Sequence, residues 1–222
     1  MPYISTDYST LYYRTFGKGK PLIFLHGNNE DSAIFDSVVS IFSDNYSVYL
    51  IDSPHHGKSA SSVNVSYYDF AKEIASFITL ASLTAPIIIG YSDGGIIGLI
   101  IAANNYAKIS GLVTIGANFN CDGLKQSCVN SIKRELAVFS GIDRDITALM
   151  LSEPKLTKED LARVSVPTLV IAGEKDLIKT SHTKALASAL PHAELKIIKD
   201  GKHFVVNHQD CFDAIKKYLK NQ

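Results

Sequence analysis

The stretch Pro86–Gly95 reads PIIIGYSDGG, an apolar run that ends abruptly at a serine between glycines. Ile87–Gly90 has the length and composition of a buried parallel strand, and the small and apolar residues of Gly94–Ala103 suit a buried helix. The glycines two residues before and after Ser92 remove the side chains that would collide in a sharp turn from strand to helix. This G-x-S-x-G spacing predicts a turn that holds Ser92 above the sheet. An ordinary βα turn can match three fixed residues by chance, so the interpretation depends on the rest of the chain.

Strands and helices alternate along most of the sequence. Apolar runs predict further strands at residues 21–25, 46–51, 111–115, 166–172 and 193–199. Helical patterns are expected over residues 32–41 with Ser32 as the cap, and over 67–83, 181–190 and 205–219. This alternation implies right-handed crossovers and an α/β fold, with a mostly parallel, doubly wound sheet and helices on both faces. Residues 1–16 predict an antiparallel β-hairpin at one edge.

The alternation lapses between residues 118 and 163. An amphipathic helix is predicted there by apolar residues at every fourth position: Leu124, Cys128, Ile132 and Leu136. A second short helix is expected around Ile146–Met150. The chain shows no internal repeat, low-complexity segment or interdomain linker. We therefore expect one domain over residues 1–222 with a helical insertion at about 118–163.

A catalytic serine needs a base, and the base needs a third group that orients it. Only positions just after the carboxyl ends of the strands can converge with Ser92, because open α/β sheets build their sites at that edge. Among the seven histidines, His203 meets this condition best, in the loop that follows the strand at 193–199. Asp176 follows the strand at 166–172, and Glu174 is a less well placed alternative. The candidate triad is therefore Ser92, Asp176 and His203.

Several motifs together resemble the α/β-hydrolase fold superfamily over essentially the whole chain. They correspond to its elbow, acid turn, histidine turn, oxyanion loop and D-x-x-G-x-G-x-S loop: Gly90–Gly94, Gly173–Asp176, Gly201–Phe204, His26–Gly27 and Asp52–Ser59. One departure is His55, which stands where that last loop has its first glycine, so the local backbone is in question. His26 is expected to brace the oxyanion loop rather than transfer protons.

The resemblance implies acyl transfer through a covalent intermediate. His203 would deprotonate Ser92 and then protonate the leaving group, while Asp176 would orient the imidazole and stabilise its charged form. The backbone N–H groups of Asn28 and Asp93 would bind the oxyanion. Serine at the elbow argues against the dehalogenase and epoxide-hydrolase branches, which attack with a carboxylate. No cofactor and no metal is expected.

An ester or thioester with a small or medium, largely apolar group is the substrate that we expect. The short insertion would cover the site, and five residues are candidates to contact the substrate: Tyr91, Phe119, Phe139, Leu149 and Met150. Hydrolysis of a carbon–carbon bond in a diketone, amide hydrolysis and cofactor-free perhydrolysis would use the same triad. A small-molecule receptor that retains the triad and a purely structural domain also stay open.

Composition limits the partners. The chain has 22 basic and 22 acidic residues, so it lacks the net field that gathers nucleic acid or an anionic membrane. The start of the chain lacks the basic-then-apolar order of a signal peptide. The apolar region 77–103 is interrupted by Pro86, Ser92 and Asp93, which argues against a membrane helix. The three cysteines lack metal-ligand spacing and are expected to be free thiols. We expect a cytoplasmic protein that acts on a small molecule without stable membrane association; its oligomeric state is not predicted.

Overall fold

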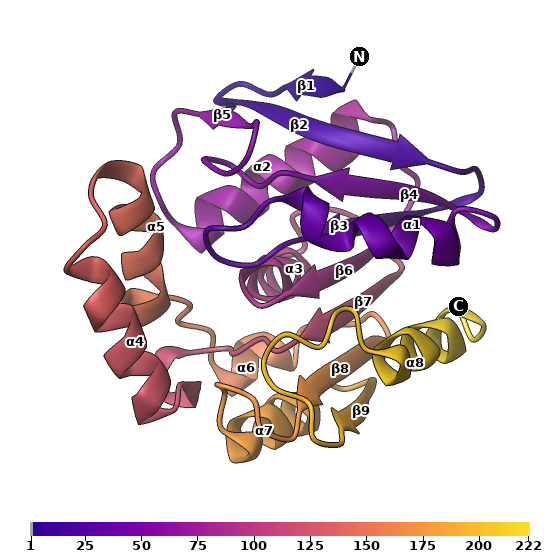
Figure 1. The fold of residues 1–222 in the computed structure, drawn as a ribbon. Coiled ribbons are helices and arrows are strands. Elements are labelled where there is room, and N and C mark those ends of the chain that lie inside the picture. The colour runs from indigo at the N-terminus through magenta and orange to yellow at the C-terminus, as the bar shows by residue number, and fades with distance from the viewer. Residues whose placement is uncertain (1) are drawn as a thin grey trace.

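A mostly parallel sheet forms the centre of the computed structural model, which describes residues 2–222, and helices cover both of its faces (Figure 1). The strands are β1 Tyr3–Ser5, β2 Ser9–Phe16, β3 Lys20–Leu25, β4 Tyr46–Ile51, β5 Ala60–Ser61, β6 Ile87–Tyr91, β7 Gly111–Ile115, β8 Thr168–Gly173 and β9 Ala193–Ile198. Their order is β1-β2-β4-β3-β6-β7-β8-β9, with β5 paired to β2. The strands from β4 to β9 in this order run parallel, which confirms the predicted fold class.

The antiparallel edge is the predicted hairpin. β1 pairs with β2 through Tyr3 and Tyr12, and β2 then pairs antiparallel with β4. Only β4 and β7 match their predicted bounds at both ends, and the other four parallel strands shift by one or two residues. The agreement is close for β6, β7 and β8 because these strands are fully buried, and a strand buried on both faces is apolar along its whole length.

The two faces of the sheet pack against separate sets of helices. One set comprises α2 Tyr67–Leu80, α3 Asp93–Asn104, α6 Lys158–Leu161 and α7 Thr180–Ala189, and the other comprises α1 Asp36–Phe42 and α8 Gln209–Leu219. In β3, Ile23 and Leu25 join the core on the first side, while Leu22 and Phe24 join the core on the second. The alternation of side chains along the strand therefore supplies both cores at once.

Two predicted helix starts were wrong. Asp31, not Ser32, caps the first helical segment: its side chain accepts from Ala33 N, whereas the Ser32 N–H donates to Asp52. A 3-10 turn over Ser32–Phe35 then precedes α1. The last helix begins at Gln209 rather than at residue 205, because the His208 ring caps it. Val205 and Val206 are buried in the loop before this helix, and their apolar side chains extended the predicted helical pattern too far toward the N-terminus.

Between β7 and α6 the chain forms two helices, α4 Gln126–Leu136 and α5 Gly141–Ser152. They pack against each other beside the carboxyl ends of the parallel strands (Figure 1). Buried residues of α4 form a small apolar cluster with Ile178, which follows β8. Among the helices of residues 2–222, none combines the length and the apolar composition that crossing a membrane requires.

The C-terminus of α3 offers a test of helix termination. Asn105 closes this helix in the left-handed conformation, with φ 53 and ψ 40. Because glycine adopts this conformation without a Cβ penalty, Asn105→Gly should raise the free energy of unfolding by about 0.5 kcal/mol. The same change one residue earlier, Asn104→Gly, should lower it by about 0.5–1 kcal/mol because residue 104 is still helical. Urea unfolding measures both, and an equal sign for the two variants would contradict this account.

Candidate active site

Ser92 occupies a strained turn between β6 and α3. Its backbone has φ 49 and ψ −115, which non-glycine residues rarely adopt. A Cβ on Gly90 would overlap the carbonyl group of Gly94, and a Cβ on Gly94 would overlap the carbonyl oxygen of Leu25. The Ser92 N–H donates to Ile115 O in β7 at 2.8 Å, which fixes the turn to the neighbouring strand. The predicted G-x-S-x-G spacing therefore has a direct steric cause.

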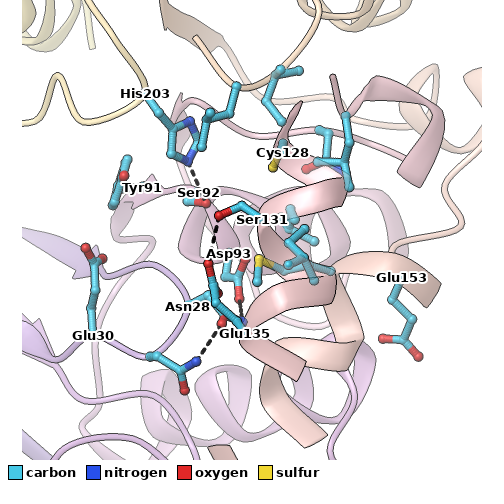
Figure 2. Close-up of a pocket in the computed structure, with 18 of the residues that line it drawn as sticks. Asn28, Glu30, Tyr91, Ser92, Asp93, Cys128, Ser131, Glu135, Glu153 and His203 are labelled. Atoms are coloured by element: carbon cyan, nitrogen blue, oxygen red, sulfur yellow. Dashed lines mark hydrogen bonds between the residues drawn. The ribbon is translucent and has the colours of Figure 1, made fainter. Parts of the chain in front are cut away.

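His203 and Asp176 converge on Ser92 from two other loops. The His203 Nε2 and Ser92 Oγ atoms are 3.1 Å apart, and the His203 Nδ1 and Asp176 Oδ1 atoms are 2.7 Å apart. Figure 2 shows the first of these contacts, between His203 and Ser92. The three residues predicted from the sequence thus form one connected chain of hydrogen bonds. A carboxylate at Nδ1 leaves Nε2 free to act as the base toward the serine hydroxyl.

The acid turn after β8 holds its carboxylate rigidly. Asp176 is 2% exposed, and its Oδ1 accepts a second hydrogen bond, from Ile178 N at 3.0 Å. Its Oδ2 accepts from Gly173 N at 3.3 Å. Glu174, the alternative acid, instead accepts from Asp200 N at 2.9 Å. Glu174 therefore joins the acid turn to the histidine loop, and Asp176 is the acid that contacts the imidazole of His203.

His26 fastens the loop that follows β3. Burial, with a contribution from nearby His56, lowers the pKa of His26 to about 4. The ring is therefore neutral at pH 7, so its Nδ1 donates to Gly27 O at 2.8 Å and its Nε2 accepts from Ser53 N at 3.0 Å. The sequence predicted this bracing role. A Cβ on the following Gly27 would lie 3.2 Å from Ser92 Cβ, so a larger residue there would crowd the serine.

The candidate oxyanion donors, the backbone N–H groups of Asn28 and Asp93, have no acceptor within residues 2–222. Asp93 is the first residue of α3, where the helix dipole favours negative charge. The Asn28 side chain donates from Nδ2 to Asp93 Oδ2 at 2.8 Å, so the two candidate residues are directly joined (Figure 2). Burial raises the pKa of Asp93, and the Asn28 amide opposes this shift by donating to the carboxylate.

The loop Asp52–Ser59 carries His55 where the D-x-x-G-x-G-x-S motif has its first glycine. This residue adopts the left-handed conformation, with φ 64, that a glycine would take more easily. The loop is held by Asp52, whose carboxylate accepts from Ser32 N and Lys58 N. A Cβ on Gly57 would overlap that carboxylate, so the second glycine of the motif is sterically required.

A cavity of about 270 Å³ opens beside Ser92 and His203. Three of the five predicted contact residues line it: Tyr91, Phe139 and Met150. The other two predictions were wrong, because Phe119 and Leu149 lie in the core on the face of the sheet that α2 and α3 cover. Phe119 stacks on the His182 ring at a centroid distance of 4.0 Å. Leu149 and Met150 are adjacent on α5, and the helical turn of about 100° between neighbours sends them to different faces.

Four carboxylate side chains also line the cavity: Glu30, Asp93, Glu135 and Glu153 (Figure 2). No Lys or Arg of residues 2–222 is among the lining residues. Burial raises the pKa of Glu30, which accepts from Gly27 N at 2.9 Å. Glu153 accepts from Tyr67 N at 2.8 Å and so caps α2. Sequence reasoning missed this acidic lining because the four residues share no motif.

Comparison with known proteins supports the fold. A family model described as alpha/beta hydrolase fold matches residues 20–126. The chain is 24% identical to a pimeloyl-[acyl-carrier protein] methyl ester esterase of Vibrio atlanticus, over 87% of this chain and 91% of that protein. It is 28% identical to the esterase of the same name from Vibrio campbellii, over 50% of this chain and 42% of that one, so this match spans less than half of the relative.

The solved structure of Est816, described as an N-acyl homoserine lactone degrading enzyme, has a TM-score of 0.83 to this chain at 21% identity, and the match covers 99% of both chains. At this identity the likeness concerns the fold. Together with the family model over residues 20–126, it shows that the chain has the α/β-hydrolase fold. Its relatives of that fold are esterase-like hydrolases.

Gly116, at the end of β7, is a site residue that sequence reasoning missed. A Cβ there would lie 2.9 Å from Cε1 and 3.0 Å from Nδ1 of His203. Gly116→Ala should therefore displace the imidazole and lower kcat/KM for ester hydrolysis by about a hundredfold, the usual cost of a misplaced catalytic group. Gly141→Ala is the matched control, because Gly141 also has a positive φ but no neighbour within 4 Å of the new methyl group. Steady-state kinetics that fall equally in both variants would contradict the role of Gly116.

Proposed function

We propose that this protein hydrolyses a small or medium, largely apolar carboxylic ester or thioester through an acyl-enzyme on Ser92. The observation that carries the proposal is the contact of 3.1 Å between Ser92 Oγ and His203 Nε2, beside a cavity of about 270 Å³. The esterase relatives support ester hydrolysis as the activity of this α/β hydrolase. A receptor that only binds would not require the nucleophile, base and acid to be connected.

In the proposed mechanism, Ser92 Oγ attacks the substrate carbonyl carbon while His203 Nε2 takes its proton. The imidazolium that forms is stabilised by Asp176, whose carboxylate is 2.7 Å from Nδ1. His203 then gives the proton to the leaving alcohol or thiol, and the acyl group stays on Ser92. A water molecule, deprotonated by the same Nε2, attacks the acyl-enzyme and releases the acid.

The negative charge of the tetrahedral intermediates would be stabilised by the N–H groups of Asn28 and Asp93. Both are unpaired within residues 2–222 and belong to residues that line the cavity beside the nucleophile. Donors that are fixed in advance need no reorganisation as charge develops, and a single one contributes on the order of a hundredfold or more in rate. The main chain donates, so the position of residue 28 matters more than its side chain for this contact.

We further propose that residues 1–222 act as one domain in which residues 118–163 form a small cap. In support, six cavity residues come from α4, α5 and the turn between them: Cys128, Ser131, Ile132, Glu135, Phe139 and Met150. A cavity of this size suits a small or medium acyl or alcohol group. Apolar and polar parts of the cap would then decide which substrates fit.

The cell compartment and partners are also proposals. Cys121, Cys128 and Cys211 are free thiols, which suits a reducing compartment such as the cytoplasm. Equal numbers of basic and acidic residues favour a small-molecule substrate over nucleic acid or an anionic membrane surface.

The proposed nucleophile can be tested with a panel of p-nitrophenyl esters and the matching thioesters and anilides, from acetyl to octanoyl. The wild type should hydrolyse short esters promptly. It should also be labelled by a fluorophosphonate, and an excess of substrate should slow that labelling. Ser92→Ala should lower kcat at least about a thousandfold, because no other group in the triad attacks carbon. Its circular dichroism should match the wild type. Undiminished turnover in Ser92→Ala would refute the mechanism, and faster cleavage of anilides than esters would assign an amidase.

The acidic lining predicts discrimination against anionic substrates. Monomethyl adipate should have a kcat/KM about tenfold below that of methyl hexanoate, because its free carboxylate would face like charge in the cavity. Glu135→Gln should narrow this ratio, since Glu135 lines the cavity on α4. Glu159→Gln, an exposed residue on α6, is the control that should leave the ratio unchanged. A wild type with a higher kcat/KM for monomethyl adipate than for methyl hexanoate would show instead that the cavity favours substrates with a free carboxylate.

A further inference from the structure

The loop after β3 is bonded by two asparagine side chains to helix α5. Asn28 Nδ2 donates to Ile146 O at 3.1 Å, and Asn29 Nδ2 donates to Thr147 Oγ1 at 2.7 Å. Thr147 is fully buried, and its hydroxyl in turn donates to Asp143 O at 2.7 Å within α5. The loop that carries a proposed oxyanion donor is therefore attached directly to the proposed cap.

The same side chains reach the other proposed donor. Asn28 Nδ2 donates to Asp93 Oδ2 at 2.8 Å, and Asn28 Oδ1 accepts from Asn29 Nδ2 at 3.0 Å. The Asn28 amide thus makes three hydrogen bonds at once, to α3, to α5 and to its neighbour, which fixes the orientation of its plane. Figure 2 shows Asn28 between Asp93 and the cap helices.

Few other contacts hold the backbone at residue 28. The His26 and Glu30 side chains secure residues 26 and 27, through Ser53 N and Gly27 N. Beyond them the chain has no regular secondary structure until Ser32, and Asn29 has a positive φ of 52. The Asn28 N–H has no acceptor within residues 2–222. The position of this N–H therefore depends on the side-chain bonds of Asn28 and Asn29.

We propose that Asn28, Asn29 and Thr147 are positioning residues that couple the seating of helix α5 to the placement of the oxyanion donor at Asn28. This inference rests on the proposed function, because it concerns the transition state of that reaction. When α5 is seated, both asparagines are bonded and the donor faces the nucleophile. When α5 moves away, Asn28 and Asn29 each lose a hydrogen bond and the donor loses its support. The cap thereby acts on kcat as well as on substrate entry.

Thr147→Val tests this coupling, because it removes the hydroxyl that Asn29 bonds while it keeps the buried volume. We expect kcat for p-nitrophenyl butyrate to fall about tenfold with KM nearly unchanged, since one supporting hydrogen bond is lost. The Ki of a trifluoromethyl ketone, which mimics the tetrahedral intermediate, should rise by the same factor. Thr147→Ser, which restores the hydroxyl, should recover both values. Ser152→Ala is the control on α5, because its hydroxyl bonds only carbonyls of its own helix.

A second readout does not require turnover. In ¹⁵N NMR spectra, the backbone amide of Asn28 should shift in Thr147→Val, return in Thr147→Ser, and stay in place in Ser152→Ala. A rise in KM alone, or an Asn28 amide that does not respond, would overturn the coupling and leave α5 as a simple wall of the cavity. Failure of the proposed function would look different, because the wild type itself would then lack turnover and fluorophosphonate labelling. The NMR comparison would still decide whether the loop and the cap are coupled.

Discussion

The turn at Ser92 is the constraint on which the rest of the site depends. A serine with a positive φ can persist only where its surroundings over-determine it, and here the carbonyl groups of Leu25 and Gly94 approach so closely that only glycines fit. The turn raises the hydroxyl above the edge where parallel strands end. Because Ser92 N donates to Ile115 O in β7, a shift of that strand would also displace Ser92.

Around this turn, the buried polar side chains of His26 and Asp176 are either neutral or fully hydrogen-bonded. His26 is kept neutral by burial and spends both ring nitrogens on the backbone. Asp176 is buried, yet each of its oxygens accepts at least one hydrogen bond, which offsets the cost of removing a charge from water. Asp93 lies beside the place where negative charge would develop. The Asn28 side-chain amide donates a hydrogen bond to that carboxylate, and the same amide orients the loop after β3.

The insertion gives the site its individual character. The family motifs lie on the sheet and its loops, whereas α4 and α5 supply part of the cavity wall. The insertion joins the rest of the molecule through a small apolar cluster at Ile178, through the asparagine loop, and through Phe119 and Leu149 in the core. A cavity wall supplied by an insertion can differ between chains of one fold while the strands and their loops stay the same. This is where substrate differences within one fold are expected to arise.

The sequence by itself determined the strands of the sheet, the order of the elements along the chain and the three side chains that meet at Ser92, because these follow from short-range rules. Buried strands must be apolar throughout, a tight elbow demands glycines at fixed spacing, and groups after strand ends share one edge. Tertiary structure alone decided which side chains face the cavity. Leu149 and Met150 are equally apolar neighbours, yet one enters the core and the other the cavity. Gly116, the four carboxylates and the bonds from Asn28 and Asn29 to α5 were equally hidden, because each joins residues far apart in the chain whose partners no local pattern specifies.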